Sequence, residues 1–276
     1  MVVRQHGHRG AAFAALAVAG VVAAAGGGCS ASGGVAADDR PGSDPGAVLK
    51  AADALRVAGS SKARTSMEMA AGGTRVTIRG EGGYDFGRRM GRLQVVLPRD
   101  PAGTSEHRPI TELLSPGVLY MKNRGAGVPA DKWVRVDSTV LEDGNLVTGG
   151  VTDPLTSAEL LRAARDVTFV GEQDLAGVRV WHYRGVTDLG RAARAASADA
   201  RGALAAAAKG FGADAVPFDA YLDEAGRLRK VRHRFSYLNQ GEPVEVASTT
   251  LLYAFGERVT VTLPPEDDIF SGEIKT

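Results

Sequence analysis

The sequence is poor in cysteine, in aromatic residues and in excess charge of either sign. One cysteine among 276 residues excludes a disulfide within the chain. Aromatic residues make up 6% of the chain whereas glycine occurs 36 times, which predicts many turns and a core of small aliphatic side chains. Lysine and arginine number 33 against 32 aspartate and glutamate residues, so the charge balance excludes the basic footprint of a nucleic-acid-binding protein.

The motifs of common catalytic and metal sites are also missing. There is no HExxH pair, no Gly-x-Ser-x-Gly nucleophile motif and no acidic calcium-binding loop. The glycines at 80, 82 and 83 lie between expected strands, where no helix N-terminus is available to bind a phosphate. We therefore predict no catalytic residue, no metal ligand and no cofactor, and we expect a protein that is not an enzyme.

The N-terminal segment has the organisation of an export signal. Arg4 and Arg9 precede an apolar run over residues 11–25, which is shorter than the roughly 20 residues needed to span a bilayer. Three glycines then precede Cys29, and this junction resembles a bacterial lipobox, although Gly26 stands where leucine is usual. The resemblance implies cleavage of residues 1–28, a diacylglyceryl anchor on Cys29, and a place on the outer face of the cell membrane. An uncleaved anchor or a secreted protein with an idle cysteine is the alternative.

The rest of the chain divides into a tether, one domain and a short tail. Residues 29–46 are rich in serine, glycine, alanine, aspartate and proline, which indicates a flexible tether. Residues 47–265 are expected to form one domain, and the 44% hydrophobic and 24% charged content of the whole chain is typical of a globular protein. Residues 266–276 are expected to be a C-terminal tail.

Apolar periodicity in the domain favours strands over helices. Helices are expected over 47–58, from Asp153–Pro154 onward, and over the alanine-rich 188–209, which Gly190 and Gly202 weaken. Alternation of apolar and polar residues predicts roughly ten or eleven strands. They are expected around 66–69, 75–79, 84–86 and 92–97, and at 110–114, 118–122, 133–136, 167–175, 178–187, 216–222, 228–238, 244–255 and 259–263. The predicted fold class is α+β: a large curved antiparallel sheet, a half-barrel, that clasps about three helices on one face.

Several stretches in a characteristic order carry a family resemblance. They are GEGGYDF at 80–86, GVLYMK at 117–122, KWVRVD at 132–137, LL at 160–161, DV at 166–167, VGE at 170–172, HYR at 182–184, VPFDAYLD at 216–223 and GRL at 226–228. Over about residues 47–265 the chain resembles the actinobacterial lipoproteins of the LppX and LprG type, which have a LolA-like fold. The resemblance implies an apolar cavity that carries the acyl chains of lipid or lipoglycan through the cell envelope.

Apolar residues of the expected strands are the candidates for lining this cavity, since methionine and aliphatic side chains suit an irregular acyl ligand. The candidates are Met67, Met69, Val76, Ile78, Tyr84, Phe86, Leu93, Val95, Leu97, Val118, Tyr120, Phe218, Phe235 and Leu252. Small side chains on the alanine-rich helix make Ala203, Ala206 and Ala207 the candidates for a gate. Plain core packing is the alternative for each lining residue. The alternative for the whole protein is an envelope sensor or scaffold that binds a protein partner and carries no lipid.

Charged and titratable residues of the expected strands have two interpretations. Lys230, Arg232 and Arg234 share one face of a strand, which we interpret as a solvated outer face. Contact with anionic lipid headgroups is the alternative. His182 and His233 fall in different strands, and the sequence leaves open that they face each other across the sheet.

Overall fold

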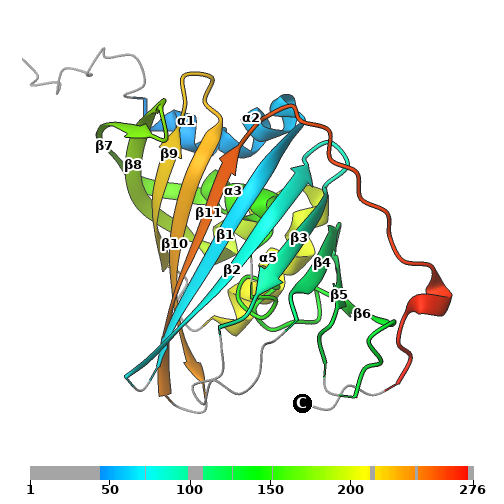
Figure 1. Cartoon of the computed structure of the whole chain (residues 1–276). Coiled ribbons are helices and arrows are strands. Elements are labelled where there is room, and N and C mark those ends of the chain that lie inside the picture. Colours follow the sequence, from blue (N-terminus) through cyan, green and yellow to red (C-terminus); the bar gives the residue numbers. More distant parts are fainter. Residues whose placement is uncertain are drawn as a thin grey trace, which may run out of the picture. The chain divides into compact units, whose positions relative to one another are not determined.

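The computed structural model describes residues 44–272, apart from 72, 99–107, 126, 151, 212–214, 240 and 241. The expected leader, Cys29 and most of the expected tether lie outside the described residues. Within the described part, eleven strands form one antiparallel sheet in the order β6-β5-β4-β3-β2-β1-β11-β10-β9-β8-β7 (Figure 1). The strands are β1 (Ser60–Ala71), β2 (Thr74–Asp85), β3 (Met90–Val96), β4 (Ile110–Ser115), β5 (Val118–Lys122), β6 (Trp133–Asp137), β7 (Ala164–Leu175), β8 (Val178–Asp188), β9 (Ala215–Leu222), β10 (Leu228–Asn239) and β11 (Glu242–Tyr253).

The sheet is open, because β6 and β7 at its two ends do not pair with each other. Consecutive strands are joined by tight turns at most positions, and the expected hairpin turn at Ala176–Gly177 has both residues at positive φ. Long alternating strands with one apolar face curl around whatever covers that face. The predicted fold class, a large open antiparallel sheet with few helices, is confirmed.

Five α-helices occur among the described residues, with α1 at Gly46–Leu49, α2 at Ala51–Ala58, α3 at Pro154–Leu160, α4 at Leu189–Ala195 and α5 at Ala198–Gly210. Short 3₁₀ turns lie at Leu161–Ala163 (η1) and Glu266–Asp268 (η2). Helix α3 begins where a helix is expected, and Asp153 caps it, since its side chain accepts a hydrogen bond from the Thr156 amide at 2.7 Å. The alanine-rich segment breaks at Ala196–Ser197, not at its glycines. None of the described helices is long and apolar enough to cross a membrane.

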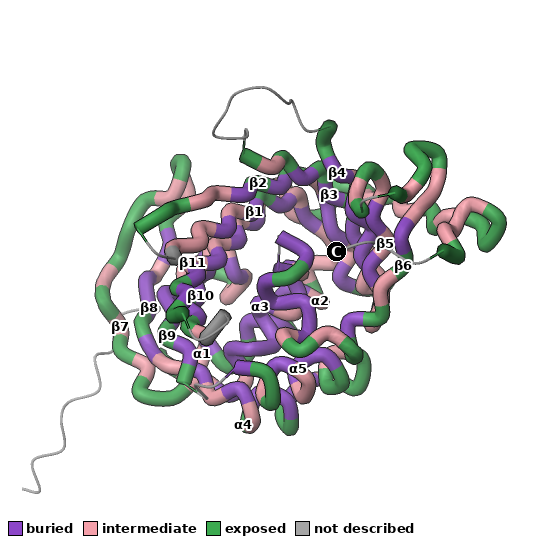
Figure 2. The backbone as a smooth tube through the Cα atoms, turned by 90° about the horizontal axis from the view of Figure 1, so that it is seen from below, coloured by how far each residue is buried: buried purple, intermediate pink, exposed green. Residues whose placement is uncertain are grey.

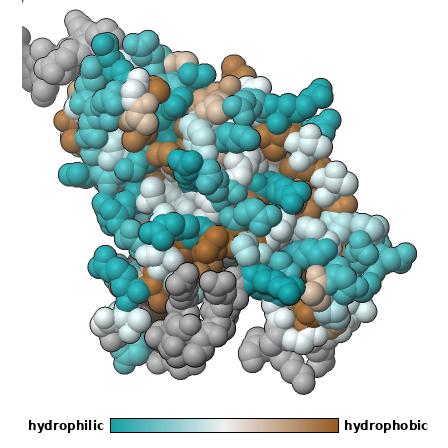
Figure 3. All heavy atoms as spheres, in the orientation of Figure 1, coloured by the Kyte–Doolittle hydropathy of each residue, from teal (hydrophilic) through white to brown (hydrophobic). Residues whose placement is uncertain are grey.

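The helices cover one face of the sheet, here called the inner face (Figure 2). The ladder register places every second residue of each strand on that face, for example Ala63, Thr65 and Met67 of β1. Ala63 and Met67 share one hydrophobic core with the helices, and Thr65 between them is a buried polar residue. Figure 3 shows the opposite, outer face, where hydrophilic side chains predominate and apolar ones form smaller patches.

The prediction of a strand at 259–263 is wrong. Both sides of β11 are already occupied by β1 and β10, so the chain after Gly256 finds no free strand edge next to β11. It runs as an extended segment past Gly83, against which Val259 packs. At the far edge it meets β6, where Ile269 forms a parallel bridge to Trp133 and the Phe270 amide donates to the Trp133 carbonyl at 2.8 Å.

Candidate functional site

Most of the apolar residues that were candidates for a cavity lie on the inner face. Met67 is aligned with Ile78 on one side and Ser248 on the other, and Met69 is aligned with Val76 and Val246. The fully or almost fully buried candidates are Met67, Ile78, Tyr84, Phe86, Leu93, Val95, Phe218, Phe235 and Leu252. Met69, Val76 and Leu97 are partly buried. The structure therefore gathers these residues in one layer beneath the helices.

Strand β5 is turned the other way from the prediction. Its buried residues are Leu119 and Met121, which align with Leu114 and Glu112 of β4, whereas Val118 and Tyr120 are only partly buried. Four consecutive residues of this strand are apolar or aromatic, so alternation alone does not define its inner face. Pairing with β4 decides it, because a shift of one residue exchanges the two faces.

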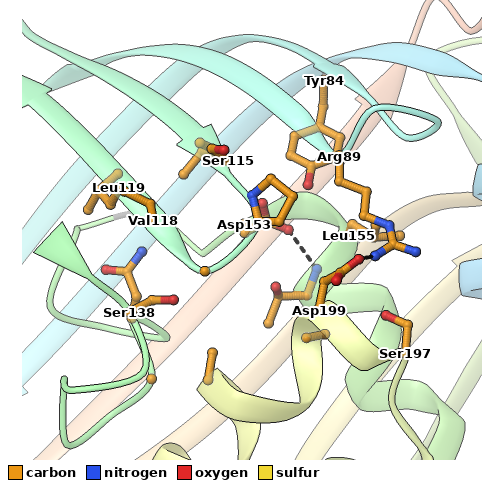
Figure 4. A pocket seen from close by; sticks show the side chains of 18 residues that line it. Tyr84, Arg89, Ser115, Val118, Leu119, Ser138, Asp153, Leu155, Ser197 and Asp199 are labelled. Carbon is orange, nitrogen blue, oxygen red and sulfur yellow. Dashed lines mark hydrogen bonds and ion pairs between the residues drawn. The ribbon is translucent and has the colours of Figure 1, made fainter. Parts of the chain in front are cut away.

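A small cavity lies between the sheet and α5 (Figure 4). Its volume is about 60 Å³, well below the roughly 300–1,000 Å³ of typical ligand pockets. Leu114, Leu119, Leu155, Ala200 and Ala203 form its apolar walls, and its polar lining includes Ser115, Ser138, Asn145, Thr156, Ser197 and Asp199. An acyl chain therefore needs more room than this cavity offers.

Polar contacts close this cavity on the side of the β2–β3 turn. Arg89 of that turn forms an ion pair with Asp199 in the first turn of α5 (Figure 4). Tyr84 hydrogen-bonds the carboxyl group of Asp153, and burial raises the pKa of both groups above their ordinary values. The first contact ties α5 to the β2–β3 turn, and the second ties β2 to the start of α3.

Close backbone contacts hold α5 from its other side. A Cβ atom at Gly144 would overlap the carbonyl oxygen of Ala203, and one at Gly210 would overlap the carbonyl of Glu142. Of the candidate gate residues, Ala203 and Ala207 are buried, while Ala206 is partly exposed. The loop 139–150 therefore packs directly on the helix that carries these alanines.

The centre of the inner face carries polar residues that sequence reasoning did not select. Ser248 bonds to Thr152 at 2.7 Å between hydroxyl oxygens, and Thr250 lies 3.4 Å from Ser157 of α3 in the same way. They alternate in phase with Val246 and Leu252, so the same periodicity that found the apolar residues could have found them. These contacts fix α3 over the middle of the sheet.

His182 and His233 do not face each other, which excludes the pairing that the sequence left open. His182 lies on the outer face, where its Nε2 is 2.8 Å from Oδ1 of Asp219 and its ring stacks on Tyr221 at 4.4 Å. His233 lies on the inner face between Phe218 and Ser248, and burial lowers its pKa to about 3. The two rings are on opposite sides of one sheet.

The outer face of β8–β10 is basic around one buried carboxylate. Asp219 accepts hydrogen bonds from Arg184 at 3.2 Å and Arg234 at 2.7 Å as well as contacting His182. Burial acts to raise the pKa of Asp219, but these hydrogen bonds outweigh burial and hold the pKa below its ordinary value. The basic residues expected on an outer face are there. Among the described residues, no three His, Cys, Asp or Glu side chains gather as metal ligands do.

Comparison with protein-family models gives no match, and comparison with curated proteins gives none. Solved structures with a similar course of the chain include the lipoprotein LppX of Mycobacterium tuberculosis, with 9% identity and a TM-score of 0.45 over 79% of this chain and 100% of that one. LprF from Mycobacterium bovis has 13% identity and a TM-score of 0.40 over 81% and 99% of the two chains. A LolA superfamily protein from Nitrosomonas europaea has 11% identity and a TM-score of 0.33 over 77% and 95%. At these values the function of the present chain has to be argued from its own residues.

Proposed function

We propose that this protein is an exported lipoprotein, anchored through a diacylglyceryl group on Cys29 to the outer face of the cell membrane, that binds the acyl chains of lipid or lipoglycan between its sheet and its helices. The leader, with its short apolar run and small residues before Cys29, supports export and anchoring. The observation that carries lipid binding is the seam between β4–β5 and α5, where an alanine-rich helix closes an apolar interior over a small cavity.

Binding an acyl chain in this seam requires α5 to move away from the sheet. The ion pair of Arg89 with Asp199 is partly solvated, and such pairs contribute only about 0–1 kcal/mol. Burial of a methylene group gains about 0.8 kcal/mol, so a whole chain gains on the order of 10 kcal/mol before ordering costs are subtracted. The gain exceeds the cost of breaking the ion pair, and the remainder offsets the loss of the core and backbone contacts that α5 gives up when it moves.

Native mass spectrometry of the chain from residue 29 onward, with Cys29 replaced by serine, tests this function. We expect a co-purifying lipid, or uptake of added envelope lipids, with more uptake when Asp199→Asn removes the ion pair to Arg89. Asp166→Asn is the matched control, because Asp166 is exposed and pairs only at 3.8 Å with exposed Arg165. A lipid-free mass that stays unchanged with added lipids in all three proteins would contradict lipid binding.

A protein-binding scaffold is the second candidate, and the filled interior favours it. A partner protein could bind at a hollow of about 430 Å³ on the outer face of β1, β2, β3 and β11. Val96, which is 52% exposed, and Leu251 supply its apolar part, while Arg64 and Glu81 lie at its charged part. Val96→Lys should then abolish cross-linking to an envelope protein in cells and leave lipid uptake unchanged. Loss of uptake with retained cross-linking would contradict this candidate.

A further inference from the structure

Glu112 is a carboxylic acid in an apolar layer. It lies on the inner face of β4, where the ladder aligns it with Leu93 of β3 and Met121 of β5. Its side chain is completely buried. Every other β4 residue on this face, Ile110 and Leu114, belongs to the hydrophobic core. A leucine at position 112 would continue that pattern.

No described residue forms a hydrogen bond with either carboxylate oxygen of Glu112. The charged group that acts on it is Arg124, in the segment after β5. The guanidinium of Arg124 instead donates to the backbone carbonyls of Thr148 at 3.1 Å and Gly149 at 3.2 Å. Arg124 thus bonds to the loop 143–150 and leaves both carboxyl oxygens of Glu112 without a hydrogen bond.

Burial raises the pKa of Glu112 to about 8, so the group is a neutral carboxylic acid at neutral pH. In that form it has one O–H donor and a carbonyl acceptor to offer. Leaving such a group unpaired in the interior costs roughly 1–3 kcal/mol. Positions that break the local folding pattern at such a cost are frequently functional.

We propose that Glu112 recognises the polar end of the bound lipid, by donating a hydrogen bond to an uncharged ester oxygen that adjoins an acyl chain. This inference rests on the proposed lipid binding and names the chemistry of its ligand. Leu114, two residues along β4 on the same face, lines the small cavity, whereas Glu112, Leu93 and Met121 lie beyond that lining. A chain that opens the seam past Leu114 therefore reaches Glu112, with its first methylenes against Leu93 and Met121. The site therefore prefers acyl esters, from a glycerolipid or from an acylated glycan, to plain hydrocarbon.

The test compares two uncharged probes, methyl palmitate and octadecane, on the chain from residue 29 onward at pH 7. Their affinities are measured by displacement of a fluorescent apolar dye, in the wild type and in Glu112→Gln, Glu112→Leu and Glu242→Leu. The glutamine keeps a hydrogen-bond donor, the leucine removes it, and Glu242 is an exposed residue of β11 that serves as the control. Replacing an unpaired buried acid by leucine leaves the core apolar, so the variant is expected to fold.

We expect the wild type and Glu242→Leu to prefer the ester, and Glu112→Leu to bind the ester about tenfold more weakly with an unchanged affinity for octadecane. Glu112→Gln should retain most of the preference. Equal binding of the ester by the wild type and Glu112→Leu would overturn the role of Glu112 while leaving lipid binding in place. Failure of the wild type to bind either probe would overturn lipid binding itself, and the role of Glu112 with it. A glycerolipid and an acylated glycan, added in turn as competitors, then distinguish the two sources of the ester.

Discussion

At the scale of single residues, two titratable groups of the inner face are neutral at pH 7 for the same physical reason. Removal from water disfavours the charged form, which raises the pKa of Glu112 to about 8 and lowers that of His233 to about 3. The acid is therefore protonated and the imidazole is not. Neither adds charge to the interior, so the inner face presents hydrogen-bonding groups within an otherwise apolar layer.

The raised pKa of Glu112 makes the fold less stable as pH increases. In the unfolded chain the group ionises near pH 4.5, whereas in the folded chain it keeps its proton up to about pH 8. The part of the stability that depends on this proton is thus fully present below pH 4.5 and is lost as the pH rises to about 8. Glu112→Gln should remove this loss and raise the free energy of unfolding at pH 8 by a few kcal/mol, at roughly 1.4 kcal/mol per pKa unit. Urea unfolding at pH 5 and pH 8 measures it, and an equal difference between the two proteins at both pH values would contradict it.

Gly82 is required by the close approach of two strands. A Cβ atom there would overlap the carbonyl group of Arg92 on β3. Gly82→Ala should therefore push β2 and β3 apart and lower the free energy of unfolding by about 1–3 kcal/mol. Gly87→Ala, in the exposed turn between these strands, meets only the tip of Asp85 at 3.4 Å and serves as the control. Thermal denaturation of both variants compares them, and equal melting temperatures would show that the strands adjust without cost.

At the scale of elements, one buried carboxylate joins three helical segments. Glu159 of α3 accepts hydrogen bonds from Arg56 of α2 at 2.6 Å, from Arg162 of η1 at 2.6 Å and from the Ser197 amide before α5 at 3.2 Å. Its side chain is fully buried. The start of α5 is therefore positioned by the same group that holds α2 against α3.

Glu159→Gln should destabilise the protein because it leaves two arginines with a neutral partner in a largely desolvated place. The expected loss is on the order of 2 kcal/mol, less than for a fully buried pair because both arginines remain partly exposed. Asp53→Asn, which affects the exposed end of the same network, should cost less than about 1 kcal/mol. Chemical denaturation of both variants measures their free energies of unfolding. A loss for Glu159→Gln no larger than that for Asp53→Asn would contradict the central role of Glu159.

Among the gate candidates on α5, Ala206 is the position at which a larger side chain should leave the core undisturbed. Ala207 is completely buried, so Ala207→Leu should overpack the interior and cost about 1–3 kcal/mol. Ala206 is partly exposed, so Ala206→Leu should leave stability within about 0.5 kcal/mol of the wild type. If α5 is the gate, Ala206→Leu alters the rate of lipid uptake at unchanged stability. Stopped-flow uptake of a fluorescent lipid measures this rate, and an unchanged rate would count against the gate.

At the scale of the whole sheet, its two edges are protected in different ways. Strand β7 is irregular, with shifts of register against β8 between Arg165 and Thr168 and between Phe169 and Gly171. Strand β6 is covered by the C-terminal segment through Ile269 and Phe270. Bulges and covering segments both prevent an edge strand from pairing with another molecule.

Removal of the segment after Leu263 should expose the edge of β6 and promote self-association. The truncated chain is expected to form dimers or larger species at concentrations at which a chain ending at Gly272 keeps its mass. The longer chain retains the bridge to Trp133, which covers the edge. Size-exclusion chromatography with light scattering measures the mass of both. A monomeric short form would show that the segment has no protective role.

The sequence by itself determined the fold class, the approximate places of most strands, and the start of a helix at Asp153–Pro154, because period-two alternation and the preference of proline for the first turn of a helix are local properties. It also determined the outward face of Lys230, Arg232 and Arg234. Only the tertiary structure decided which residues of β5 face inward, that His182 and His233 lie on opposite faces, and that 259–263 forms no strand. Each of these depends on which strands pair with each other. The same holds for Glu112, which the sequence shows as one acid among many. Its burial, and with it the proton it keeps at neutral pH, comes from Leu93 and Met121 on neighbouring strands.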